Sequence, residues 1–158
     1  MRIWAAVPAA ACAVMLLAAG NKPEQQARFL AEGEAKMVVA RRCANCHTAG
    51  NFTKFRKDEA GWEQVMADMA NRGAEIPDDD YDGIVAYLAR NYGPSAKLAI
   101  NRAPVEEVGK LLELSKEQAK AVVAWREANG AFRSLEDLVK VPGLDARKLE
   151  SRREMLAF

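Results

Sequence analysis

Helix breakers recur along this chain at short intervals, and they constrain its fold more than any other feature. They fall at Gly73, at Gly93-Pro94-Ser95, at Asn129-Gly130 and at Pro142-Gly143. Between them, apolar residues recur at spacings of three and four, which is typical of amphipathic helices, and no segment alternates convincingly as a strand would. The sequence therefore predicts an all-α protein built from short helices.

The clearest internal break is the Gly93-Pro94-Ser95 segment, and we expect one domain at residues 21–95 and a second at 96–158. Three helical regions are predicted in the first domain, at about residues 23–46, 58–72 and 78–92, with a polar loop of about ten residues after the first region. Four short helices are predicted in the second domain, at about residues 104–112, 116–128, 135–139 and 146–156.

The first twenty residues, MRIWAAVPAAACAVMLLAAG, have the pattern of a secretory signal peptide, with Arg2 ahead of an apolar run that ends in small residues. We therefore predict a signal peptide at residues 1–20 and a location in the periplasm. An uncleaved anchor is the alternative, although an apolar run of about 17 residues is at the low edge of spanning length. Membrane contact is expected only in that case.

Charge does not indicate a partner for the chain as a whole. It has 23 basic and 22 acidic residues, so whole-protein attraction to nucleic acid or acidic lipid is weak. Residues 96–158 are mildly basic, with twelve basic and ten acidic side chains.

The segment Cys43-Ala44-Asn45-Cys46-His47 contains the only histidine of the chain and both cysteines that follow the predicted signal peptide. It has the Cys-x-x-Cys-His pattern of covalent c-type haem attachment. Two thiols three residues apart can add to the two vinyl groups of one porphyrin, and the adjacent imidazole can reach the iron. We predict one haem c, attached at Cys43 and Cys46, with His47 as the proximal iron ligand.

Other chemistries fit this segment less completely. A redox-active dithiol leaves the adjacent histidine unexplained, and a structural zinc site needs four ligands where the segment supplies three. A plain disulfide between the two cysteines stays open. A second histidine ligand within the chain is excluded, so a methionine is the candidate for the sixth iron position.

Four methionines follow the signal segment. Met66 and Met69 lie on the predicted helix 58–72, whereas Met37 and Met155 are expected in the core. A methionine on an apolar helical face usually serves only for packing, so both readings stay open for Met66 and Met69 at this point.

Residues 32–94 resemble the small class I c-type cytochrome domains of bacterial periplasmic electron-transfer proteins. The resemblance depends on the Cys-x-x-Cys-His segment, on GWEQVMADMANRGA at residues 61–74 and on DDDYDGIVAYLARNYGP at residues 78–94. It implies a compact helical fold around one haem, with Met69 as the distal ligand and Met66 as the second choice. Trp62 is then expected at the haem edge, and Arg56, Lys57 and Arg72 are candidate partners of the propionates.

The second domain resembles the paired helix-hairpin-helix domain of the DNA-uptake receptor ComEA and its relatives. The residues that carry the match are Asn101, Trp125-Arg126-Glu127, Asn129-Gly130, Phe132, the segment 134–138 and Val141-Pro142-Gly143. In such hairpins, backbone N–H groups at a helix start hold a DNA phosphate, and a Gly-x-Gly turn allows the close approach.

This chain departs from the Gly-x-Gly pattern in both hairpins. The first turn reads Leu112-Glu113-Leu114-Ser115-Lys116 and has no glycine, while the second keeps Gly143 but has Asp145 in place of the second glycine. Because both carboxylates should repel DNA, we expect docking to a partner protein ahead of DNA binding.

The leading functional hypothesis is therefore a periplasmic monohaem c-type cytochrome that carries electrons between an unidentified donor and acceptor and docks through its second domain. We expect no enzymatic activity and no small-molecule substrate. Two alternatives stay open: a ComEA-like DNA-binding protein that carries a haem domain, and a haem-based sensor with an open sixth coordination position.

Overall fold

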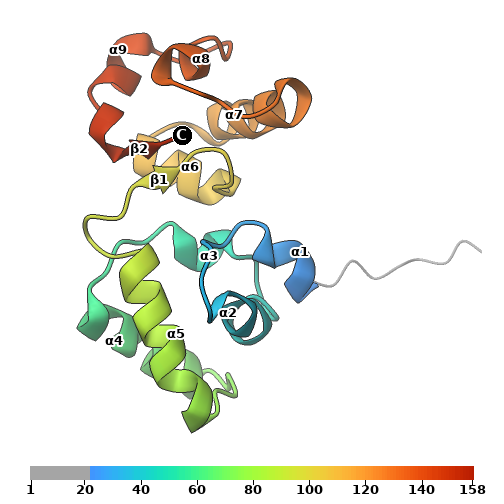
Figure 1. The fold of residues 1–158 in the computed structure, drawn as a ribbon, viewed down its shortest axis with the longest axis vertical. Helices are drawn as coiled ribbons and strands as arrows, with labels where there is room; N and C mark the ends of the chain where they lie inside the picture. Colours follow the sequence, from blue (N-terminus) through green and yellow to red (C-terminus); the bar gives the residue numbers. More distant parts are fainter. Residues whose placement is uncertain (1–21) are drawn as a thin grey trace, which may run out of the picture.

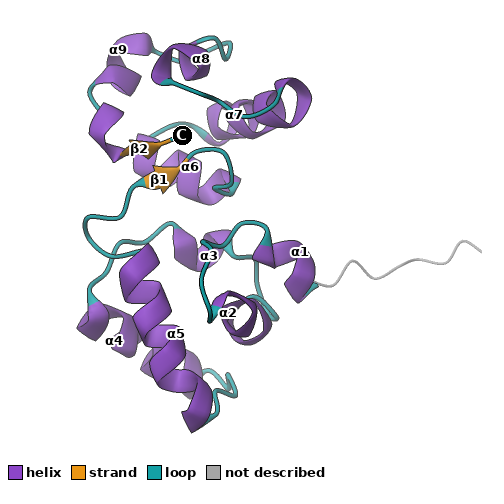
Figure 2. Cartoon of the chain, in the orientation of Figure 1, coloured by secondary structure: helices purple, strands orange, loops and turns teal. Residues whose placement is uncertain are grey.

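The computed structural model describes residues 22–158, so the predicted signal segment at residues 1–20 lies outside the described residues. Within 22–158 the chain is mostly helical, and Figures 1 and 2 show an N-terminal region of helices α1 to α5 below a C-terminal region that contains α6 to α9. None of the helices in this part of the chain combines the length and apolar character needed to cross a membrane.

The N-terminal region contains five helices. Their bounds are α1 Pro23–Ala27, α2 Lys36–Cys43, α3 Gly50–Thr53, α4 Glu59–Asn71 and α5 Asp78–Asn91. The single helical region predicted from residue 23 to 46 is wrong in detail, because the chain breaks where Gly33 takes a φ of 155° that other residues rarely adopt. The short helix α3 falls inside the predicted polar loop.

Local signals explain the bounds of α4. The Asp58 carboxylate caps its start by accepting a hydrogen bond of 2.9 Å from the backbone N–H of Gly61. Its end is followed by Gly73, which takes a φ of 91°. The observed helix therefore agrees with the predicted one to within a residue at each end.

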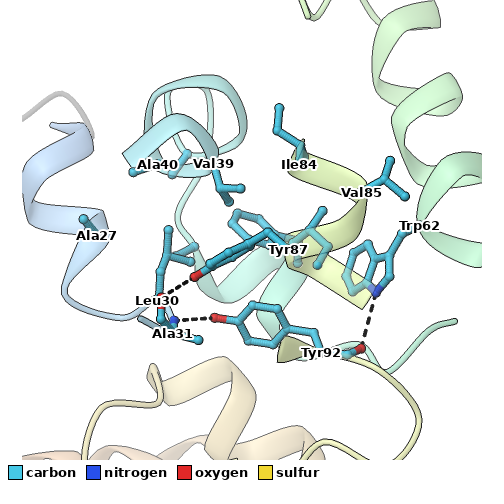
Figure 3. Packing of buried hydrophobic residues seen from close by; sticks show 14 of the residues in the cluster. Ala27, Leu30, Ala31, Val39, Ala40, Trp62, Ile84, Val85, Tyr87 and Tyr92 are labelled. Atoms are coloured by element: carbon cyan, nitrogen blue, oxygen red, sulfur yellow. Dashed lines mark hydrogen bonds between the residues drawn. The ribbon is translucent and has the colours of Figure 1, made fainter. Parts of the chain in front are cut away.

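Two tyrosines of the α5 segment tie the core of this region to the chain between α1 and α2 (Figure 3). The Tyr87 hydroxyl donates to the carbonyl of Ala31 at 2.5 Å, and the Tyr92 hydroxyl accepts from the backbone N–H of Ala31 at 3.1 Å. The indole of Trp62 on α4 donates to the carbonyl of Tyr92 at 3.3 Å. These contacts hold α4, α5 and the α1–α2 connection around one hydrophobic cluster.

The C-terminal region forms two helix hairpins. Its elements are β1 Leu98–Ala99, α6 Val105–Leu112, α7 Lys116–Asn129, α8 Leu135–Val139, α9 Ala146–Glu150, a 3₁₀ helix Arg153–Met155 and β2 Leu156–Ala157. The expectation of no strand is wrong, since β1 and β2 form a short parallel pair. The helix predicted at residues 146–156 ends at Glu150, because Leu156 pairs with Leu98 and closes the region.

Side chains of the second region hold its loops in place. Ser115 and Gln118 form a complete capping box at the start of α7. The Asn101 side chain accepts a hydrogen bond from the N–H of Phe132 at 2.7 Å and donates to its carbonyl at 2.8 Å. These interactions surround a second hydrophobic cluster, separate from the first.

The two regions meet where α3 packs against α6. At this contact, the guanidinium of Arg56 and the carboxylate of Glu107 form an ion pair at 2.9 Å, with 12% and 5% of their side chains exposed. The same guanidinium also donates to the carbonyl of Ala96, in the connection between the regions.

Two core predictions are wrong. Met37 and Met155 were expected in the core, but 38% and 37% of their surfaces are exposed. Met37 lies on α2, whose buried residues are Val39 and Ala40, while Met155 lies in a 3₁₀ helix that buries none of its residues.

Candidate functional site

A cavity of about 570 Å³ lies in the N-terminal region, between the segment that follows α2 and the helices α4 and α5. Its apolar wall includes Phe52, Phe55, Trp62, Val65, Ile76 and Leu88, and its polar wall includes Arg42, Asn51, Lys57, Asp68 and Arg72. The predicted site residues Cys43, Cys46, His47, Met66 and Met69 all line it. The structure therefore brings together five side chains that are up to 26 positions apart in the chain.

Both thiols at this cavity are free, so the plain disulfide is not formed. Cys43 is the last residue of α2 and is partly buried, while Cys46 is exposed in the turn that follows. Burial raises the pKa of the Cys43 thiol to about 12. A redox-active dithiol depends on a thiol with a lowered pKa, so this environment disfavours that chemistry.

The imidazole of His47 is held by its own neighbour. Its Nδ1–H donates to the carbonyl of Thr48 at 3.1 Å, and its ring meets the ring of Phe52 edge-on with 6.0 Å between centroids. A backbone carbonyl on one ring nitrogen is the usual way in which a protein fixes the tautomer of a metal-binding histidine. Nε2 is then the nitrogen available as a ligand.

The two candidate methionines differ in their surroundings. Met66 is buried and belongs to the hydrophobic cluster, whereas Met69 lines the cavity but is only partly buried and lies outside that cluster. The backbone carbonyl of Met69 accepts hydrogen bonds from Arg72 and Ala74, both at 3.0 Å, which fixes the turn after α4. Packing therefore explains Met66 better than it explains Met69.

Some of the basic side chains that were predicted to pair with haem propionates lie at the cavity. Lys57 and Arg72 line it, but Arg56 is wrong as a propionate candidate, because its guanidinium is committed to Glu107 and to backbone carbonyls. Sequence reasoning missed Arg42, which also lines the cavity and pairs with Asp80 at 2.8 Å. Its position immediately before Cys43 is the signal that could have indicated it.

The first hairpin turn, between α6 and α7, includes Glu113 in a left-handed conformation with a φ of 52°. That conformation favours glycine, so the backbone has the shape of the expected turn even though the residue differs. The Glu113 carboxylate pairs with Arg152, and the Glu113 carbonyl accepts from the Lys148 ammonium. The charge that we expected to repel DNA is thus partly compensated.

The second hairpin turn, between α8 and α9, has Gly143 at a φ of 83°. Asp145 caps α9, and its carboxylate accepts from the backbone N–H groups of Arg147 at 2.8 Å and Lys148 at 3.3 Å. The Gln118 side chain on α7 donates to the carbonyl of Gly143 at 2.7 Å. The two hairpin turns are therefore in direct contact and form one surface.

Comparisons with known proteins match this second region. Residues 94–157 match the family model described as the helix-hairpin-helix motif. ComE operon protein 1 of Bacillus subtilis is 36% identical over 58 residues, which are 37% of this chain and 28% of that protein. An uncharacterized protein of Haemophilus influenzae is 37% identical over 65 residues, which are 40% of this chain and 58% of that protein.

A protein of another kind is about equally similar to this chain. Kinesin-like protein KIF22 of Xenopus tropicalis is 35% identical over 52 residues, which are 33% of this chain and 8% of that protein. This chain spans less than two thirds of the length of each of these relatives. No solved structure matches. Residues 94–157 are therefore a helix-hairpin-helix domain with ComE homology.

The prediction of a monohaem c-type cytochrome that acts as an electron carrier is wrong. The matching family model covers only the helix-hairpin-helix region, one relative is ComE operon protein 1, and none of the relatives reported above is named as a cytochrome. The error has a physical origin. The Cys-x-x-Cys-His segment indicates a ligand chemistry within five residues, and amphipathic helices around it occur in many folds, so together they do not establish a protein class.

Proposed function

We propose that this chain is a ComEA-like DNA-binding protein whose helix-hairpin-helix domain binds the phosphate backbone of duplex DNA. The observation that carries the proposal is the direct contact between the two hairpin turns, within a region that matches the helix-hairpin-helix motif from residue 94 to 157. Binding of this kind needs no catalytic step. We also propose export by the segment at residues 1–20, which would place the DNA-binding domain outside the cytoplasm.

The start of α7 is the best candidate for a phosphate contact. It has fourteen residues, so the partial positive charge at its N-terminus is well developed. Lys116 is its first residue and is exposed, with no ion pair among the described residues. A phosphate at this position would meet both the ammonium and the helix start.

The second hairpin would contact DNA phosphates with its side chains more than with its backbone N–H groups. Asp145 already occupies the N–H groups of Arg147 and Lys148. The Arg147 side chain is exposed and forms no ion pair in residues 22–158, so it is available to a neighbouring phosphate. Because the turns touch, Lys116 and Arg147 can contact one DNA backbone together.

The test is the affinity of the full chain for a fluorescent DNA duplex, measured by anisotropy for wild type and for the double substitution Lys116→Glu, Arg147→Glu. Both positions are exposed in the first turn of a helix, where glutamate is compatible with folding. We expect the double substitution to weaken binding about tenfold or more, because it reverses two phosphate contacts.

The matched control is Arg90→Glu, a charge reversal of an exposed residue on α5, far along the chain from the hairpins. It should leave DNA affinity nearly unchanged. The control reverses one charge and the double substitution reverses two, so a control that loses about half as much binding free energy, or more, would show that only overall charge matters and would contradict the proposed surface.

We further propose that the cavity of the N-terminal region holds a covalently attached haem c. The cavity volume of about 570 Å³ falls in the range of about 300–1,000 Å³ of small-molecule and cofactor sites. The donor set also fits: two free thiols, one imidazole with a fixed tautomer and the Met69 thioether line the same space. A haem bound there would supply ligand-binding or redox chemistry of its iron.

In this second proposal each residue has one task. Cys43 and Cys46 would form the two thioether bonds, His47 would supply Nε2 to the iron, and Met69 would supply its sulfur as a further ligand, with Met66 as the second choice. Trp62 and Phe52 exclude water from the apolar wall. The haem sensor with an open sixth position remains the alternative if neither methionine binds.

The test is the intact mass of the chain produced in cells that carry a c-type maturation system. Wild type should gain one haem that survives denaturation. Cys43→Ala combined with Cys46→Ala should retain none. A wild-type chain that matures at its unmodified mass would contradict the haem proposal and leave the DNA proposal standing.

A further inference from the structure

Residues 50–57, which comprise α3 and the turn after it, contact both the cavity and the helix-hairpin-helix domain; we call them the bridge segment. On one side, Asn51, Phe52, Phe55 and Lys57 line the cavity. Phe55 is 40% exposed although it is a large apolar residue, so its surroundings depend on what fills the cavity. A bound guest would cover this ring and restrict the segment that carries it.

The other side of the bridge segment packs tightly on α6. A Cβ atom placed at Gly50 would lie 3.2 Å from the Cβ of Glu106, which is tighter than most real contacts between such atoms, so the two helices approach closely here. Arg56 and Glu107 add the buried ion pair at 2.9 Å. Displacements of the bridge segment can therefore be passed to α6 through the Arg56–Glu107 ion pair and the close approach at Gly50.

Arg56 also makes hydrogen bonds within the bridge segment. Its guanidinium donates to the carbonyls of Thr53 at 2.8 Å and Phe55 at 3.0 Å, and to Ala96 in the connection at 2.9 Å. One side chain thus ties the backbone beside Phe55 to Glu107 on α6. Arg56 thus links the domain contact to Phe55, which lines the cavity.

Helix α6 continues directly into the first hairpin turn. It ends at Leu112, and the next residue is Glu113, whose carboxylate and carbonyl bind Arg152 and Lys148. The start of α7 follows three residues later. A change in α6 therefore reaches the surface where DNA is proposed to bind.

We propose that occupancy of the cavity and DNA binding by the helix-hairpin-helix domain are coupled through the bridge segment, so that a filled cavity strengthens DNA binding. This inference rests on the proposed function, for both the DNA surface and the haem. A guest that orders Phe55 holds Arg56 against Glu107 in advance, so less freedom is lost when DNA binds. Such coupling is reciprocal and typically amounts to about 5-fold to 150-fold in affinity.

The experiment compares the DNA affinity of the full chain in its haem-loaded form and in the unloaded Cys43→Ala, Cys46→Ala form. Each form is measured with the native bridge segment and with Arg56→Ala. In the native background we expect the loaded form to bind the duplex at least about 5-fold more tightly. With Arg56→Ala the two forms should bind equally, within about 2-fold.

A second variant and a second readout guard against misfolding. Glu107→Gln keeps the size of the side chain and removes the ion pair, so it should reduce the coupling without disrupting the contact. Amide hydrogen exchange should slow in residues 105–112 on loading in the native background only. The outcome that overturns the inference is an equal loaded-to-unloaded ratio in all three backgrounds.

The experiments distinguish failure of the DNA proposal from failure of the haem proposal. If neither form binds DNA, the DNA proposal fails, and the coupling fails with it. If the chain gains no haem, the mass measurement shows this before any affinity is compared, and the coupling is overturned through the cofactor alone.

Discussion

The two regions of this molecule contain similar elements, but only the C-terminal region closes around its own core. Both consist of short helices around an apolar cluster, with glycines at the breaks. The C-terminal region closes on itself, because β1 and β2 join its two ends and Asn101 fixes the loop after α7. The N-terminal region surrounds a cavity of about 570 Å³ instead. The second region therefore closes around its own core, while the first leaves a cavity beside its core.

The largest effect should come from truncating the closed core. Leu138 on α8 is fully buried in the C-terminal cluster, so Leu138→Ala should lower the free energy of unfolding by about 2–5 kcal/mol. Leu88→Ala is the matched control, since Leu88 is equally buried but already faces the cavity. In the unloaded protein it should cost less, because the new space joins an existing hollow. Denaturant unfolding of both variants measures this; equal costs would contradict the comparison.

A smaller effect is expected at the loop that closes the second region. Asn101→Ala removes both hydrogen bonds to the backbone of Phe132, and it should lower the free energy of unfolding by about 1–3 kcal/mol. Asn129→Ala is the control, because that amide donates to the carbonyl of Trp125 on the exposed end of α7. Thermal unfolding compares them. A greater loss at residue 129 than at residue 101 would show that the loop contact is not what closes the region.

The contact between the regions should respond to pH. Burial raises the pKa of Glu107 above its usual value, and this outweighs the opposing effect of Arg56. A carboxyl whose pKa is raised on folding makes the folded state bind more protons than the unfolded state, so stability falls as pH rises above the ordinary glutamate pKa of 4.5. Wild type should therefore lose stability relative to Glu107→Gln as the pH rises from 4.5. An opposite slope would mean that the ion pair dominates.

The smallest effect on stability is expected at Met69, which is only partly buried. In haem-loaded protein, Met69→Ala should leave the free energy of unfolding within about 1 kcal/mol of wild type but allow the reduced protein to bind carbon monoxide. Met66→Ala is the control. It should lower the free energy of unfolding more than Met69→Ala does, because Met66 lies in the hydrophobic cluster, and it should not allow carbon monoxide to bind. Carbon monoxide binding by wild type would instead favour the sensor reading.

The bounds of α4 to α8 could be predicted because local signals determine them: Asp58, Gly73, Ser115 and Gly130 lie at helix ends. The cavity lining could be partly predicted because the Cys-x-x-Cys-His segment is contiguous. The β1–β2 pair and the Arg56–Glu107 contact could not, since each joins residues more than 50 positions apart that no local pattern connects.

The prediction of the protein class was wrong for a related reason. The short motif at residues 43–47, together with the departures at Glu113 and Asp145, outweighed the helix-hairpin-helix resemblance, although the whole of residues 94–157 matches that motif. Those departures were judged by charge alone. Arg152 compensates Glu113, and the Asp145 carboxylate is engaged in capping α9, neither of which the sequence reveals.

The most direct test of the account is the salt dependence of duplex DNA binding by the full wild-type chain. We expect the logarithm of the association constant to fall linearly with the logarithm of salt concentration. Two to four phosphate contacts predict a slope of about −2 to −4. Absence of binding at low salt, or binding that does not weaken as salt rises, would contradict the claim that the helix-hairpin-helix domain holds the DNA backbone.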